Sequence, residues 1–160
     1  MKLEFETTLN DCGVELEAIK TAISADRFAT TNRFLISYAV IKASGTIESI
    51  CKNMIFEKIS GGASEEAKEF LRRGIVEASF NPSVGKIKML LEKINSSWAT
   101  EFDNRTKASS DKSNLTSLVT LRNSFAHGDA ITATIENVIT YFASGKSVIE
   151  IVDDILVNSV

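Results

Sequence analysis

The sequence predicts an all-α fold, a single-domain bundle of about six to seven helices covering residues 1–160, with its core between about residues 10 and 157. Three observations predict it. The 160 residues include one proline and eight glycines, so few residues interrupt helices. Apolar side chains recur at three- and four-residue spacing along most of the chain. A hydrophobic fraction of 44% supports one compact core, and the length leaves little room for a second domain.

The first two helices follow from apolar stripes. The second helix, over about residues 28 to 59, is long enough to form the spine of the core. The stripe of the first helix consists of Leu9, Cys12, Leu16, Ile19 and Ile23, and that of the second of Ile36, Val40, Ala43, Ile47, Ile50 and Met54.

Cap residues mark the third and fourth helices. Ser64, followed by two glutamates, is typical of an N-cap and begins a third helix that runs to about Phe80. A fourth helix is predicted to begin with Asn81 as its cap and Pro82 at its first helical position, where the missing N–H costs nothing.

The remaining chain predicts an exposed connection and three more helices. Residues 95–114 are rich in Ser, Asn, Asp, Lys and Thr, which favours an exposed, mobile connection. A fifth helix over about residues 111–127 should end at Gly128, a typical C-terminal cap residue. Two short helices, at 134–143 and 147–157, complete the expected bundle.

Charge and cysteine content narrow the classes of function. The net charge of −3 argues against capture of nucleic acid by overall positive charge, although a local basic surface could still bind it. Cys12 and Cys51 lack the close Cys or His neighbours of a zinc site, so we expect buried free thiols, no metal site and no cofactor. The acidic start and the short apolar run Phe34–Ile41 favour a cytoplasmic protein with no secretion signal and no membrane partner.

The fifth helix carries the residues of chemical interest. On a helical wheel with Leu121 at zero, a core side is expected between about 0° and 60°, and a second side between about 100° and 240°. This second side is half apolar and half reactive, which suits a surface that a second copy of the chain buries. The core side holds Leu118, Leu121 and Phe125; the second side holds the predicted catalytic residues Arg122, Asn123 and His127 and the predicted dimer-interface residues Leu115, Val119 and Ala126.

These residue types fit RNA cleavage without a metal ion. A base removes the proton of the ribose 2′-OH, the resulting oxygen attacks the adjacent phosphate, and a cation stabilises the anionic transition state. His127, the only histidine, supplies the titrating group, and Arg122 supplies the cation. Asn123 is placed to hydrogen-bond the imidazole or a phosphate oxygen. The alternative is that His127 only ends the helix while Arg122 extends over Leu118.

The segment Leu118–Gly128 resembles the signature of the HEPN superfamily, an arginine, a polar residue and, four to six residues after the arginine, a histidine. The form here is R-N-x-x-A-H-G. Further resemblance to the RiboL-PSP-HEPN branch lies in Tyr38, Gly45, Ile47 and Glu48, in Asn81 to Leu91, and in Thr134 to Leu156.

The resemblance implies a helical homodimer in which arginine and histidine motifs of two protomers face each other across a cleft. It further implies an endoribonuclease of toxin–antitoxin or antiviral-defence type, with an antitoxin or defence protein as a possible partner. Some HEPN toxins carry a modified tyrosine where this chain has Asp129, so regulation by that route is not expected. A catalytically silent HEPN module that binds RNA or a protein, and a helical subunit unrelated to HEPN, remain as alternatives.

Four further residues are weaker candidates for substrate binding. Glu48 would line the cleft or pair with Arg122, although a structural ion pair or partial exposure is the favoured explanation. Arg72 and Arg73 would follow an RNA backbone, or simply belong to a solvated helix face. Trp98 would stack on a base from its loop, or instead dock on the core.

Overall fold

The computed structural model describes residues 1–158, and in that range it contains seven α-helices, one π-helical turn and no strand. The prediction of an all-α bundle is confirmed. The elements are α1 (Leu3–Ala25), α2 (Asn32–Ser60), α3 (Glu65–Leu71), η1 (Arg72–Val76), α4 (Val84–Ile94), α5 (Ser96–Thr106), α6 (Asp111–Ala126) and α7 (Ile135–Asn158).

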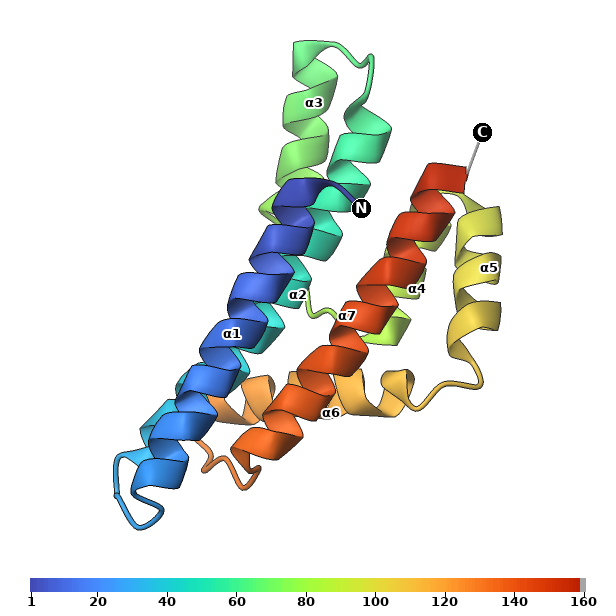
Figure 1. Cartoon of the computed structure of the whole chain (residues 1–160). Coiled ribbons are helices and arrows are strands. Elements are labelled where there is room, and N and C mark those ends of the chain that lie inside the picture. Colours follow the sequence, from blue (N-terminus) through green and yellow to red (C-terminus); the bar gives the residue numbers. More distant parts are fainter. Residues whose placement is uncertain (159–160) are drawn as a thin grey trace.

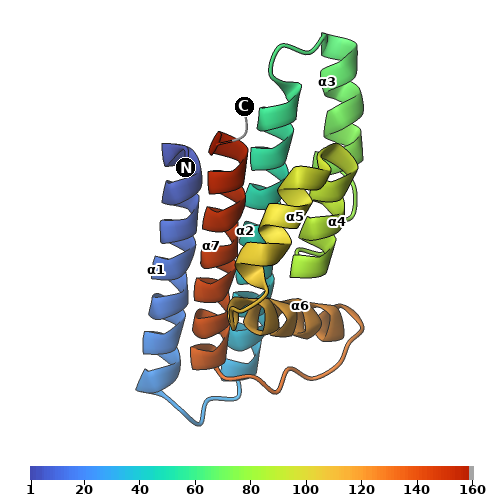
Figure 2. The ribbon, with the colours of Figure 1, turned by 90° about the vertical axis from the view of Figure 1, so that its right-hand side faces the viewer.

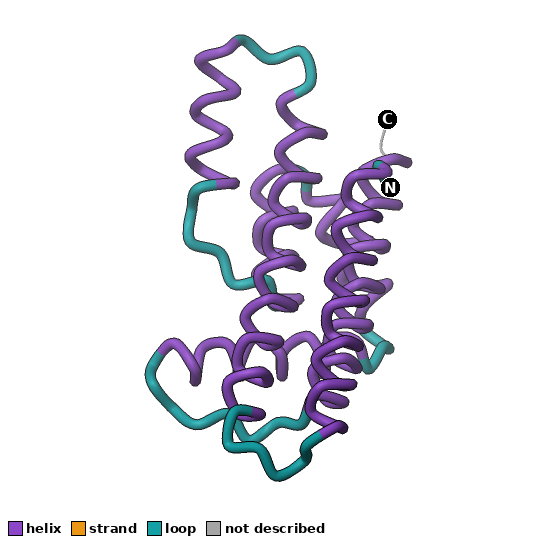
Figure 3. The backbone as a smooth tube through the Cα atoms, turned by 60° about the vertical axis from the view of Figure 1, so that its left-hand side comes forward, coloured by secondary structure: helices purple, strands orange, loops and turns teal. Residues whose placement is uncertain are grey.

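The three long helices α1, α2 and α7 lie side by side, and α6 lies across them at one end of the molecule (Figures 1 and 2). The short helix α3 lies at the opposite end, beside the end of α2 (Figure 1). Helices α4 and α5 pack against each other, and α5 also packs on α7. Helix α7 therefore occupies the centre of the bundle, because α1, α2, α5 and α6 all contact it. Loops connect the α-helices of the described chain, except that η1 continues directly from α3 before the loop to α4 (Figure 3).

Helix α2 is the predicted spine, shifted by only a few residues from its predicted bounds. Its side chains at Val40, Ala43 and Ile47 are completely buried. In the described part of the chain, α2 is also the one helix whose length and composition would allow it to cross a membrane. In this fold it contacts α1, α6 and α7, so its apolar side chains form the core of the bundle.

The prediction of two short helices at 134–143 and 147–157 is wrong, because α7 continues unbroken through them. Ser144 and Gly145, which fall in the expected gap between the two short helices, are both buried. A Cβ atom at position 145 would lie 3.0 Å from the Ile47 side chain of α2. The small residues thus allow α7 to approach α2 closely, and they do not end the helix.

The prediction of an exposed connection over residues 95–114 is also wrong for its first half, which forms α5. The Asn95 side chain caps this helix by accepting a hydrogen bond of 2.9 Å from the Ser97 backbone N–H. The buried side of α5 consists of Trp98, Ala99, Phe102 and Thr106. Because so few apolar residues are needed to cover one side of a short helix, the polar composition of the segment hid it.

A serine side chain caps the N-terminus of each of the helices α3 and α4. The Ser64 side chain accepts a hydrogen bond from the Ala67 backbone N–H, which confirms the predicted cap of α3. At α4 the prediction is wrong, since Ser83 is the cap and accepts from the Lys86 N–H at 3.4 Å. Asn81 therefore belongs to the loop, and its side chain is not used to cap a helix.

Candidate functional site

The end of α6 is fixed by a glycine in the left-handed conformation. Gly128 has a φ of +85°, and its N–H donates to the Phe125 carbonyl at 3.0 Å. The Asp129 N–H donates to the Ser124 carbonyl at 2.9 Å, so the two bonds form the Schellman arrangement. The predicted helix end at Gly128 is thus observed. His127 is the last residue before this turn, with φ −91° and ψ 3°, and its side chain is exposed.

Arg122 and Asn123 are half-buried, in contrast to His127. The Arg122 Nη1 donates to the Asn123 Oδ1 at 3.4 Å, which links the two side chains. His127 follows Arg122 by five positions, which corresponds on a helix to about 140° of rotation and 7.5 Å of rise. Within one chain the guanidinium and the imidazole therefore start from the two edges of the broad side of α6 that the sequence predicts.

A fourth residue, Asn81, joins this group from the loop between η1 and α4. Its Nδ2 donates to the Asn123 Oδ1 at 3.3 Å, across a separation of 42 residues. Sequence reasoning assigned Asn81 to a helix cap and missed its contact with the predicted catalytic segment. The signal that could have pointed to it is Ser83, which is an equally good cap residue and makes Asn81 unnecessary in that role.

The predicted dimer-interface residues Leu115 and Val119 are not on an outer face. Leu115 is completely buried and Val119 is 5% exposed within a single protomer. Conversely Phe125, predicted to lie in the core, is 43% exposed. The buried side of α6 is thus rotated from the predicted one, because both α2 and α7 pack on this helix. Of the three predicted interface residues only Ala126 is exposed, and its role in a dimer stays a prediction.

Two of the weaker candidates have structural roles. The Glu48 carboxylate accepts a hydrogen bond of 2.9 Å from the Lys52 Nζ, one turn further along α2, and the Lys52 side chain is only 8% exposed. Trp98 is 9% exposed and belongs to the core side of α5. The structural ion pair and the docked tryptophan, both stated above as alternatives, are therefore observed.

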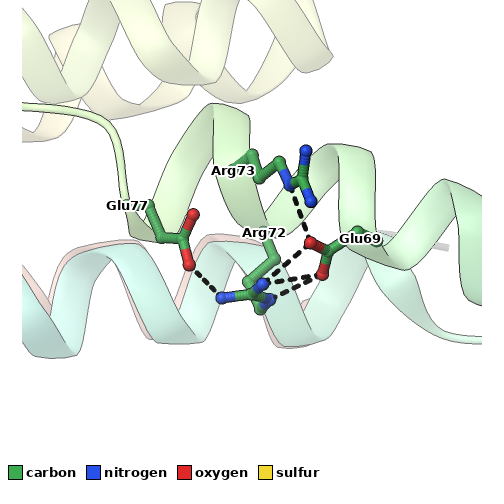
Figure 4. A network of polar contacts seen from close by, with 4 residues as sticks. All are labelled: Glu69, Arg72, Arg73 and Glu77. Atoms are coloured by element: carbon green, nitrogen blue, oxygen red, sulfur yellow. Dashed lines mark hydrogen bonds and ion pairs between the residues drawn. The ribbon is translucent and has the colours of Figure 1, made fainter.

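Arg72 and Arg73 are engaged with carboxylates (Figure 4). The Arg72 Nη2 lies 2.7 Å from the Glu69 Oε2, and its Nη1 contacts Glu77. The Arg73 Nε donates to the Glu69 Oε1 at 2.7 Å. Arg72 and, second, Arg73 hold the pKa of the Glu69 carboxyl below its usual value. With two acids beside two arginines this cluster is close to neutral, so it offers RNA little net positive charge.

A hollow of about 380 Å³ lies on another side of α6, between that helix, the loop that follows it and α7. Arg122, Asn123 and His127 do not line it. Its lining residues are Thr116, Ser117, Thr120, Leu121, Thr132, Ala133, Asn137 and Tyr141. Between residues 1 and 158 no three His, Cys, Asp or Glu side chains are gathered in a way that could hold a metal ion.

Comparison with protein families gives one match. The model of the RiboL-PSP-HEPN family matches residues 8–158, which is nearly the whole chain and includes the α6 segment and Asn81. Searches of curated proteins and of solved structures returned no match.

Proposed function

Because this chain belongs to the RiboL-PSP-HEPN family, we propose that it is a metal-independent endoribonuclease that cuts RNA at a composite site formed by two copies of the chain. The observation that carries the proposal is the placement of the only histidine. His127 is exposed at the end of α6, next to Arg122 and Asn123, which are half-buried and hydrogen-bonded to each other.

In the proposed reaction His127 acts as a general base or acid. When it takes the proton of a ribose 2′-OH, the 2′-oxygen attacks the adjacent phosphorus and the bond from phosphorus to the 5′-oxygen breaks. The leaving 5′-oxygen takes up a proton from water and the protonated His127 returns its proton to solvent, so the products carry a 2′,3′-cyclic phosphate and a 5′-hydroxyl. The Arg122 guanidinium stabilises the charge on the phosphoryl oxygens, and Asn123 orients the reacting groups.

The spacing within one chain supports a site shared between two copies. The rotation of about 140° between positions 122 and 127 places the two side chains at opposite edges of one broad side of α6, too far around the helix to converge easily on one phosphate. In a twofold dimer each copy presents the same surface, so the Arg122 of one copy can meet the His127 of the other. The exposed Phe125 and Ala126 lie between them in sequence and would supply apolar contact area for such an interface.

The direct test is RNA cleavage in EDTA by the purified chain. We expect wild type to cut single-stranded RNA and to leave the corresponding DNA intact, because DNA lacks the 2′-OH. His127→Ala and Arg122→Ala should each lower the rate by at least about a hundredfold. Lys112→Ala is the matched control, since it removes one positive charge from the exposed surface at the other end of α6. Cleavage that requires added Mg²⁺, or that survives His127→Ala, would contradict the proposal.

The same variants address the biological role. We place the enzyme among ribonucleases of toxin or antiviral-defence type, with an antitoxin or defence protein as partner. Wild-type expression should then arrest bacterial growth, and His127→Ala should abolish the arrest. Should wild type and His127→Ala both dimerise and neither cut RNA, the chain is instead a silent HEPN module that binds RNA or a protein.

A further inference from the structure

Asn81 reaches Asn123 of α6 from a distant part of the chain through a side-chain hydrogen bond between two amides. It lies in the loop that leads from η1 to α4, and this loop runs toward α6 (Figure 3). The bond joins the Asn81 Nδ2 to the Asn123 Oδ1 at 3.3 Å. The same Asn123 oxygen accepts from the Arg122 Nη1 at 3.4 Å, so one oxygen lies between two donors.

The chemistry of the three side chains fixes the direction of both bonds. A guanidinium only donates hydrogen bonds, so Asn123 must turn its oxygen toward Arg122. Asn81 must then present its NH₂ group, because its own oxygen would face the Asn123 oxygen and repel it. With its oxygen occupied in this way, Asn123 keeps its Nδ2 for another acceptor, such as a phosphate oxygen or the imidazole one turn further along.

The cost of this arrangement indicates that the amide of Asn81 has a role other than stability. Its Oδ1 is buried and has no hydrogen-bond partner among the described residues. A buried acceptor without a partner lowers stability, and an apolar side chain of similar size, such as leucine, would avoid that cost. Helix capping does not explain the residue either, because Ser83 caps α4.

We infer that Asn81 is a positioning residue of the ribonuclease site: from the loop between η1 and α4 it holds the Asn123 amide, and through it the Arg122 guanidinium, in the orientation that the reaction needs. This inference rests on the proposed function. Asn81 does not touch the substrate in this scheme. Its effect reaches the phosphate only through Asn123 and Arg122.

Two substitutions separate the hydrogen bond from the packing. Asn81→Asp keeps the shape of the side chain but replaces the donating NH₂ by a second acceptor, and Asn81→Ala removes the group altogether. Both should lower kcat for a short RNA about tenfold, as expected for loss of one hydrogen bond of ordinary strength, and leave KM within about twofold. Ser79→Ala, an exposed residue of the same loop, is the matched control and should retain the wild-type kcat.

A double-mutant cycle shows whether Asn81 acts through Asn123. The double variant Asn81→Ala, Asn123→Ala should be no slower than Asn123→Ala alone, since the partner of Asn81 is already absent. If the fall in kcat of the double variant equals the product of the falls in the two single variants, the inference is overturned. It is also overturned if the Asn81 variants lower the melting temperature but keep the wild-type kcat. If wild type itself does not cut RNA, the proposed function fails. If wild type cuts and the Asn81 variants cut equally fast, only this inference fails.

Discussion

Gly145 of α7 and Ile47 of α2 pack so closely that a Cβ atom at position 145 would lie 3.0 Å from both the Cγ1 and the Cδ1 of Ile47. Both residues are buried. This contact lies where α2, α6 and α7 meet, because the same Cβ would also lie 3.5 Å from the Leu115 side chain of α6. The crossing therefore depends on the absence of one methyl group.

We expect Gly145→Ala to destabilise the protein, by about 1 to 3 kcal/mol for the overpacking less the gain of roughly 1 kcal/mol that alanine brings to a helix. Gly45→Ala in α2 is the matched control, since no atom lies within 4 Å of a Cβ built there. That variant should gain stability. Urea denaturation followed by circular dichroism measures both, and equal effects of the two substitutions would contradict the close approach.

Leu115→Ala should destabilise each protomer by about 2 to 5 kcal/mol, because the side chain is completely buried within one chain. This loss should not depend on protein concentration. The midpoint of denaturation could instead shift with protein concentration more strongly in the variant than in wild type. That result would indicate that Leu115 lies in a dimer interface.

A heterodimer tests the composite site. When Arg122→Ala and His127→Ala copies carry different tags, purification on both tags yields a heterodimer. One of its two shared sites keeps both groups, and the other site has neither. We expect this heterodimer to cut RNA at about half the wild-type rate, while each homodimer of a variant remains inactive. An inactive heterodimer would show that both groups must come from one chain.

The ion pair between α1 and α2 should make stability depend on pH. The Lys42 Nζ lies 2.8 Å from the Glu15 Oε2, and Tyr38 also donates to this carboxylate. Lys42, and then Tyr38, lower the pKa of Glu15 below its ordinary value of 4.5. Its contribution is therefore present above about pH 4.5 and is lost as pH falls through the lower, folded-state pKa.

Accordingly, Glu15→Gln should reduce the free energy of unfolding at pH 7 by less than about 1 kcal/mol, as is usual for an exposed pair. The difference from wild type should vanish in acid. In a Lys42→Met background the same substitution should have a smaller effect, and denaturation curves measured from pH 7 down to pH 3 would show it. An effect of Glu15→Gln that grows on acidification would contradict the assignment.

Both cysteines should resist thiol reagents in the native state. Cys12 and Cys51 are free and buried, and burial raises the pKa of the Cys51 thiol to about 12 and that of Cys12 above its ordinary value. Since the thiolate is the reactive form, neither should react rapidly with a disulfide reagent at pH 8, and both should react after denaturation. Rapid native-state labelling of either residue would show that the α1–α2 contact opens.

The sequence predicts α2 and α6 well because an apolar stripe continues along each of them. Helix α2 was expected at about residues 28 to 59 and α6 at about 111 to 127, close to their observed bounds. Local patterns do not predict the structure correctly where the same pattern is compatible with two structures. Residues Ser147 to Glu150 have the spacing of a capping box and so predict a helix start, but α7 runs through them and the Ser147 hydroxyl donates to the Ala143 carbonyl at 3.3 Å.

The candidate site can be predicted from the sequence only in part. The residues of one helix are found from their spacing, so Arg122, Asn123 and His127 could be identified as a group. A helical wheel gives their relative directions but not which side the rest of the fold covers, and thus Leu115 was assigned to the wrong side. Asn81 lies 42 residues before its partner, and no local pattern encodes that contact.

The left-handed turn at Gly128 sets the direction in which the chain leaves α6 and so the place of the imidazole before it. Gly128, which has no side chain, thus determines where the His127 side chain lies. An L-amino acid at this position would strain the backbone and shift the neighbouring His127, although Gly128 itself takes no part in the proposed reaction. If the proposed toxicity holds, a random screen for growth-permitting variants should therefore recover changes at Gly128 alongside changes at the proposed catalytic residues.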